Sequence, residues 1–245
     1  MILTTFLATT ALITGSIWIM QTPLLHVASL TAEGTAGCGE EELIETSGLT
    51  LEDNMLVVMF SGYARARERI LLRYSFLQEV SFRYRPDRSV RIIATERTPV
   101  ARVVREDRKY LLDDAWVLFE IPVMDEASSL LLLTGLSFAG ENLPEDLKKP
   151  DNMSRRDVYK RLTTEIIEVD LARETNLLTE ITGIDLTNPG QPKITVADRI
   201  ILDLGGMEDL DLKIPLFMEA FRGNLKTQRG TFTFTDSRTG HFIPE

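Results

Sequence analysis

The segment from Val80 to Arg102 limits the possible folds of this chain more than any other stretch of its sequence. Apolar and polar residues alternate from Val80 to Tyr84 and again from Val90 to Ala94, with a turn sequence, Pro86–Ser89, between them. Because successive side chains of a strand point to opposite faces, the pattern predicts an antiparallel hairpin with one buried face. Pro99 follows, and since proline has no N–H for a central ladder, it predicts a strand boundary and a domain junction.

Composition narrows the functional classes. The chain has 245 residues with 44% apolar content, which is enough for a membrane segment and one or two small domains. Its formal net charge of -10 argues against a nucleic-acid-binding protein, because phosphate affinity depends on Lys and Arg. Basic residues nevertheless gather between Arg65 and Lys109, where thirteen of them face six acidic ones, a local balance of +7. A solvated surface is the plainer interpretation of this stretch, and a face that meets anionic lipid headgroups is the alternative.

The first 20 residues contain no charged side chain. About 20 apolar residues suffice for a helix to cross a bilayer, and Trp18 stands where an interfacial aromatic residue is expected. The sequence therefore predicts a transmembrane helix over residues 1–22. A cleaved signal peptide is the competing interpretation, although the segment lacks a basic start and an A-x-A site. No basic residue precedes the helix, so the positive-inside rule gives no orientation.

Residues 24–97 are expected to follow the order strand, helix, helix, strand, strand. An extended segment, Leu25–Gly34, leads into a short helix at Glu40–Thr46, which Gly48 ends. A second helix, Ala64–Tyr74, has apolar residues at helical spacing, and the hairpin completes the order.

Residues 98–245 are dominated by predicted strands and turns. The expected strands are Val100–Val104, Tyr110–Leu112, Trp116–Ile121, Leu177–Leu186, Pro192–Val196, Arg199–Leu204 and Arg229–Thr235, with a closing extended segment at Gly240–Ile243. One helix is expected to begin at the capping box Ser154–Asp157, behind a polar loop at Leu143–Met153. Another is expected from Leu210 to Leu225.

Two motifs carry a resemblance to a known family. The strand that ends in E-R-T-P-V-A, Glu96–Ala101, followed by Y-L-L-D-D-A, Tyr110–Ala115, resembles the FtsQ/DivIB family of bacterial cell-division proteins. Ile201–Gly205 and Lys213–Leu216 are similar to two further family segments. The resemblance implies an α+β fold: an N-terminal transmembrane helix (residues 1–22), a POTRA domain of order β-α-α-β-β (residues 24–97), and a C-terminal domain (residues 98–245) with a curved β-sheet and helices on one face.

The sequence offers no candidate active site. His26 and His241 are the only histidines and stand at opposite ends of the soluble region, so a Ser-His-Asp triad or a histidine metal site would need the two ends to meet. Cys38 is the single cysteine, which excludes an internal disulfide and a cysteine-based metal site. Glycine motifs that hold phosphates or dinucleotides are absent. We therefore expect no catalytic residue, cofactor, metal ion or small-molecule substrate, and a protein that is not an enzyme.

A strand near the chain end is the candidate binding surface. Thr231, Thr233 and Thr235 alternate with phenylalanines, and if this strand forms a sheet edge, its free N–H and C=O groups can pair with another chain. An internal position of the strand is an equally good interpretation. The resemblance favours the edge, because the family binds small division proteins by strand addition at this part of the sheet. It adds Phe234 and Phe242, which fall near family aromatics, although the family's Arg-Tyr pair is absent.

The resemblance implies a non-enzymatic scaffold of the divisome that links early and late division proteins. Its partners would be FtsB/DivIC-like and FtsL-like proteins, and it would be a single-pass protein of the cell inner membrane, mostly extracytoplasmic, at the division septum. The alternatives are a POTRA-containing component of outer-membrane biogenesis or secretion, and an envelope hydrolase. An added charge in Thr231–Thr235 is expected to abolish partner capture without unfolding the domain.

Overall fold

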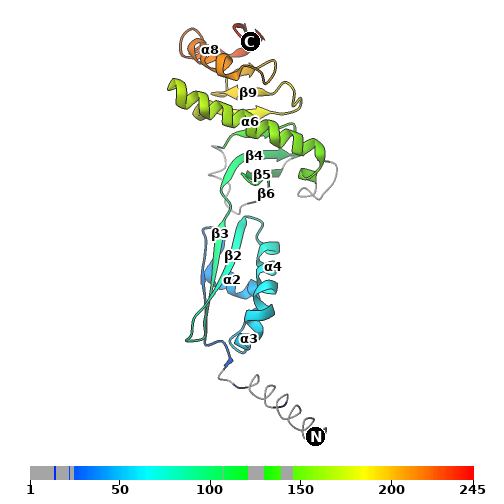
Figure 1. Ribbon diagram of the computed structural model, residues 1–245, viewed down its shortest axis with the longest axis vertical. Coiled ribbons are helices and arrows are strands. Elements are labelled where there is room, and N and C mark those ends of the chain that lie inside the picture. Colours follow the sequence, from blue (N-terminus) through cyan, green and yellow to red (C-terminus); the bar gives the residue numbers. More distant parts are fainter. Residues whose placement is uncertain (1–13, 15–21, 23–24, 107, 121–129, 139–145) are drawn as a thin grey trace, which may run out of the picture. The chain divides into compact units, whose positions relative to one another are not determined.

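A computed structural model describes residues 14, 22, 25–106, 108–120, 130–138 and 146–245 (Figure 1). The chain divides into two compact units, unit 1 (Met1–Arg97) and unit 2 (Thr98–Glu245). The division falls beside Pro99, the first residue of a strand that belongs to unit 2.

Unit 1 is a three-stranded sheet packed against helices. Its elements are β1 (Ser29–Glu33), α2 (Glu40–Ser47), α3 (Met55–Val57), the π-helix η2 (Val58–Gly62), α4 (Tyr63–Arg73), β2 (Leu77–Tyr84) and β3 (Ser89–Glu96). The predicted hairpin is confirmed, because β2 and β3 pair antiparallel with Val80 opposite Ala94 and Phe82 opposite Ile92. β3 is the central strand, since β1 pairs with its other side in parallel.

Unit 2 is built on one nine-stranded mixed sheet. Its elements are β4 (Pro99–Arg105), β5 (Arg108–Asp113), β6 (Leu118–Phe119), β7 (Leu132–Thr134), α6 (Pro150–Arg173), α7 (Leu177–Glu180), β8 (Ile181–Asp185), β9 (Lys193–Val196), β10 (Ile200–Asp203), α8 (Leu210–Arg222), β11 (Gly230–Asp236) and β12 (Thr239–Pro244). The strand order is β12-β11-β10-β9-β8-β7-β4-β5-β6. Parallel strands need a crossover connection, and α6 and α8 supply it between β7 and β8 and between β10 and β11.

α6 and α8 share one hydrophobic core with the sheet of unit 2 (Figure 1). Ile166 of α6 and Phe217 of α8 are fully buried against alternate strand residues such as Ile194 and Leu202. On the other face of β10, Ile201 stays 41% exposed. The burial alternates because one face of the sheet meets the helices and the other meets water.

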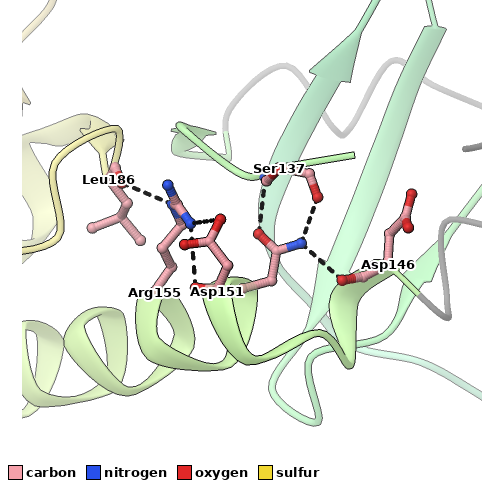
Figure 2. A network of polar contacts seen from close by, with 6 residues as sticks. Ser137, Asp146, Asp151, Arg155 and Leu186 are labelled. Atoms are coloured by element: carbon pink, nitrogen blue, oxygen red, sulfur yellow. Dashed lines mark hydrogen bonds and ion pairs between the residues drawn. The ribbon is translucent and has the colours of Figure 1, made fainter. Parts of the chain in front are cut away.

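A polar network fixes the first turns of α6 to the sheet (Figure 2). Asn152 is fully buried, and its Nδ2 donates to the Ser137 carbonyl at 2.6 Å and to the Asp146 carbonyl at 2.9 Å. Its Oδ1 accepts from the Ser137 N–H at 2.8 Å. Three residues later, Arg155 Nε donates to the Leu186 carbonyl at 3.1 Å. The start of α6 therefore holds together the segments that follow β7 and β8.

The predicted fold class needs one correction, which concerns its transmembrane helix. None of the helices in the described part of the chain is long and apolar enough to cross a membrane. The expected span, residues 1–22, lies outside the described residues except for Thr14 and Thr22. The fold class that the structure supports is α+β, with a small sheet in unit 1 and a large mixed sheet in unit 2.

Three predicted element boundaries are wrong. The second helical segment of unit 1 begins at Met55 rather than Ala64, because the Asn54 side chain caps it by accepting from the Leu56 N–H at 2.9 Å. α6 begins with Pro150 as its first residue, so the capping box at Ser154–Asp157 lies inside the helix. Part of the strand expected from Leu177 is the short helix α7.

Replacing the buried side chain of Asn152 should destabilise unit 2. Asn152→Ala leaves one N–H and two carbonyl groups unpaired in a buried position, and we expect it to lower the free energy of unfolding by about 2 to 4 kcal/mol. Lys160→Ala is the matched control, because Lys160 is exposed on the same helix. Chemical denaturation of the full chain measures both changes, and equal destabilisation would contradict a structural role for the amide.

Candidate functional site

The free edge at the C-terminal end of the unit 2 sheet is β12 and not β11. β11 pairs in parallel with β10 on one side and antiparallel with β12 on the other. The prediction that Thr231–Thr235 form an edge is therefore wrong, because Thr231 and Thr233 lie in the part of β11 that pairs on both sides. Within the described residues no strand follows β12 in the sheet, so the open backbone groups belong to Thr239–Pro244.

The outward-facing groups of β12 follow from the register. The Glu245 N–H donates to the Arg229 carbonyl at 3.0 Å, so Glu245 directs its backbone toward β11. Hydrogen-bonded and non-hydrogen-bonded residue pairs alternate in an antiparallel ladder. The backbone N–H and C=O groups of His241 and Ile243 therefore point toward β11 as well. The alternate residues Gly240, Phe242 and Pro244 direct their backbone groups to the open side, where Pro244 has only a carbonyl to offer.

β12 differs in charge from the two edge strands of unit 1. β2 carries Glu79 and Arg83, and β1 carries Glu33, which pairs with Arg91. Charged side chains on edges discourage pairing with another chain. β12, with the sequence TGHFIP, has no Asp, Glu, Lys or Arg. Its backbone is therefore the least protected of these three edges against strand addition.

A groove of about 590 Å³ lies beside this edge on the helix-covered side of the sheet. α8 contributes Leu216 and Ala220 to its wall, β11 contributes Phe232, and the β11–β12 hairpin contributes Arg238 and Gly240. A Cβ at Gly240 would lie 2.3 Å from Cζ of the Phe232 ring, so any other residue there would have to displace that ring. A strand added to β12 could place one side chain in this groove.

The hairpin turn that presents β12 is held by one carboxylate. Asp236 accepts from the Arg238 N–H at 2.8 Å and from the Thr239 N–H at 2.7 Å. The hydrogen bond from Arg238, followed by the contribution of Thr239, lowers the pKa of Asp236. Because the folded pKa is lowered, this carboxylate supports the turn above its ordinary pKa and loses that effect as the pH falls through the folded value.

The five predicted binding residues take different positions. Thr231 and Thr233 are half-buried, Thr235 is exposed, Phe234 is a core residue at 5% exposure, and Phe242 is half-buried. Only Phe242 belongs to the edge strand. Ile243 and Gly240 of the edge strand were not predicted as binding residues, although an extended segment was predicted at Gly240–Ile243.

The described residues contain no group of side chains that could form a metal centre. Among them, no three His, Cys, Asp or Glu side chains come close enough to hold a metal ion. His26 belongs to unit 1 and His241 to the exposed face of unit 2. What the site offers chemically is backbone hydrogen bonding and a groove.

The chain matches no family model and no curated protein. The likeness to the FtsQ/DivIB family therefore depends on the residues quoted above.

The pairing of β12 with β11 should depend on the lack of a side chain at Gly230. A Cβ at Gly230 would lie 2.2 Å from the Ile243 carbonyl oxygen and 2.9 Å from the Pro244 Cα, both backbone atoms. We expect Gly230→Ala to push β12 away, to cost about 1 to 3 kcal/mol and to speed hydrogen exchange at the β12 amides.

Gly190→Ala is the matched control, because its Cβ would meet only Asn188 Oδ1 at 3.5 Å, an ordinary contact. Unchanged amide exchange in Gly230→Ala would show that the two strands do not depend on this close approach.

Proposed function

We propose that this chain is a non-enzymatic scaffold of the bacterial cell-division machinery that resembles FtsQ/DivIB. It captures FtsB/DivIC-like and FtsL-like partners by adding a partner strand to β12. The observation that carries the proposal is an uncharged terminal strand with open backbone groups beside a groove. Strand addition takes its affinity from main-chain hydrogen bonds and its specificity from pockets for alternate side chains, and this edge offers both.

Two features of the chain support the family assignment over a general peptide-binding protein. Unit 1 has the order strand, helices, strand, strand that the resemblance implies for a POTRA domain. The E-R-T-P-V-A motif lies where unit 1 passes into unit 2, at Glu96–Ala101. On this proposal the chain acts at the division septum, on the extracytoplasmic side of the inner membrane.

The face of β12 opposite the helices provides a sharp test. Ile243 is 61% exposed on the edge strand, and Ile201 is 41% exposed on β10. Both lie opposite Thr231, on either side of it. They are therefore comparable side chains on one face, and only one belongs to the edge.

A lysine at the edge should block partner binding. We expect Ile243→Lys to weaken the binding of an FtsB/DivIC-like peptide by about tenfold or more, a loss of about 1.4 kcal/mol, because edge lysines oppose strand pairing. Ile201→Lys adds the same charge two strands away and should leave the affinity unchanged. Isothermal titration of the full chain measures both. Equal affinities for the two variants would refute binding at β12.

The peptide itself can distinguish strand addition from contact between side chains. In a ladder, only alternate N–H groups of the added strand point toward β12. N-methylation of one alternate set should therefore abolish binding, and methylation of the other set should not. A fluorescent fusion of the chain in dividing cells tests the septal location, and a signal spread evenly over the envelope would contradict it.

A further inference from the structure

Unit 1 carries an exposed apolar corner, formed by Leu51, Val57, Met59 and Phe60. Their exposed fractions are 54%, 47%, 45% and 87%. Single exposed apolar residues are ordinary, but four within ten positions of the sequence are a local concentration of exposed apolar side chains. Met59 and Phe60 lie in the π-helix η2, and single π-turns inside α-helices occur frequently at functional sites.

A cavity of about 230 Å³ lies beside the apolar corner and shares Val57 with it. Arg65 and Arg69 of α4 line this cavity. Arg65 donates to the Ser61 side chain at 3.0 Å, and Arg69 donates to the Ser47 carbonyl at 3.2 Å. In the described part of the chain neither guanidinium has a carboxylate within ion-pair distance.

The acidic residues near the corner are fewer than the arginines, and one of them already accepts a hydrogen bond. Asp53 also lines the cavity, and its carboxylate accepts from the Thr50 N–H at 2.7 Å. Glu52 is exposed beside Leu51. From Val57 to Arg73, however, four arginines stand against one glutamate. The side of the corner that α4 forms is therefore positive.

We propose that the apolar corner and the cavity of Arg65 and Arg69 form a contact site for an anionic phospholipid surface. Guanidinium groups bind phosphate oxygens in a bidentate manner, and apolar side chains beside them can enter the boundary between headgroups and acyl chains. Arg65 and Arg69 donate hydrogen bonds to Ser61 and to the Ser47 carbonyl but form no ion pair, and lipid phosphates would supply the negative charge. The site lies in unit 1 and does not depend on strand addition to β12.

A dye attached at the corner tests the proposal in the full chain. Phe60→Cys can be labelled with an environment-sensitive dye, because Cys38 is buried and burial raises the pKa of its thiol. With vesicles that contain phosphatidylglycerol, we expect the emission to shift to the blue and the dye to become protected from aqueous quenchers. Vesicles of pure phosphatidylcholine should give a weaker response, and inorganic phosphate alone should give none.

Leu72→Cys is the matched control. Leu72 is 79% exposed near the end of α4, about 18 Å along the helix from Phe60 at 1.5 Å per residue. A dye at this position reports general adsorption of the chain and should remain in water. Arg65→Gln in the Phe60→Cys chain should raise the lipid concentration at half-maximal response roughly fivefold, the effect of one basic residue near an anionic surface.

Several results would overturn the proposal. These are an equal response at positions 60 and 72, no response at 60 with anionic vesicles, or a response that Arg65→Gln leaves unchanged. A blue shift at 60 that grows with protein concentration in the absence of vesicles would instead assign the corner to a second copy of the chain.

Discussion

The parallel pairing of β10 with β11 is the constraint on which the architecture of the candidate binding site depends. Two parallel strands cannot be joined by a tight turn, so the chain has to cross the face of the sheet, and α8 makes that crossing. The crossing places β11 inside the sheet and leaves the hairpin partner β12 at its end. It also brings Leu216 and Ala220 of α8 to the wall of the groove beside Gly240.

Local patterns predicted the parts of the fold that local chemistry decides. Alternation along Val80–Tyr84 predicted the β2–β3 hairpin, because the buried face and the turn together specify the register. The first helix was predicted to within one residue of its end, since Gly48 takes the left-handed conformation that ends helices with φ 65°. In both cases the residues that decide the structure are neighbours in the sequence.

The parts that sequence reasoning missed depend on distant residues. Phenylalanine and threonine alternate along Gly230–Asp236 whether that strand is internal or at an edge, and only the pairing with β10 decides which it is. α7 replaces only the first four residues of the strand predicted at Leu177–Leu186, because the Asp170 carboxylate accepts from the N–H groups of Leu177 and Leu178 at 3.0 and 2.9 Å. Because β11 is internal, the candidate binding site is β12, the next strand of the sheet.

The proline at the end of β12 has a consequence for any chain that docks there. Gly240 and Phe242 supply the outward N–H donors of this strand, and Pro244 supplies none. If an added strand shifts its register by two residues toward the C-terminus of β12, it meets Pro244 in place of a residue with an N–H donor. It then loses one backbone hydrogen bond. For a strand that adds to β12, Pro244 would therefore favour one register, in which the same side chain of the added strand lies beside Gly240.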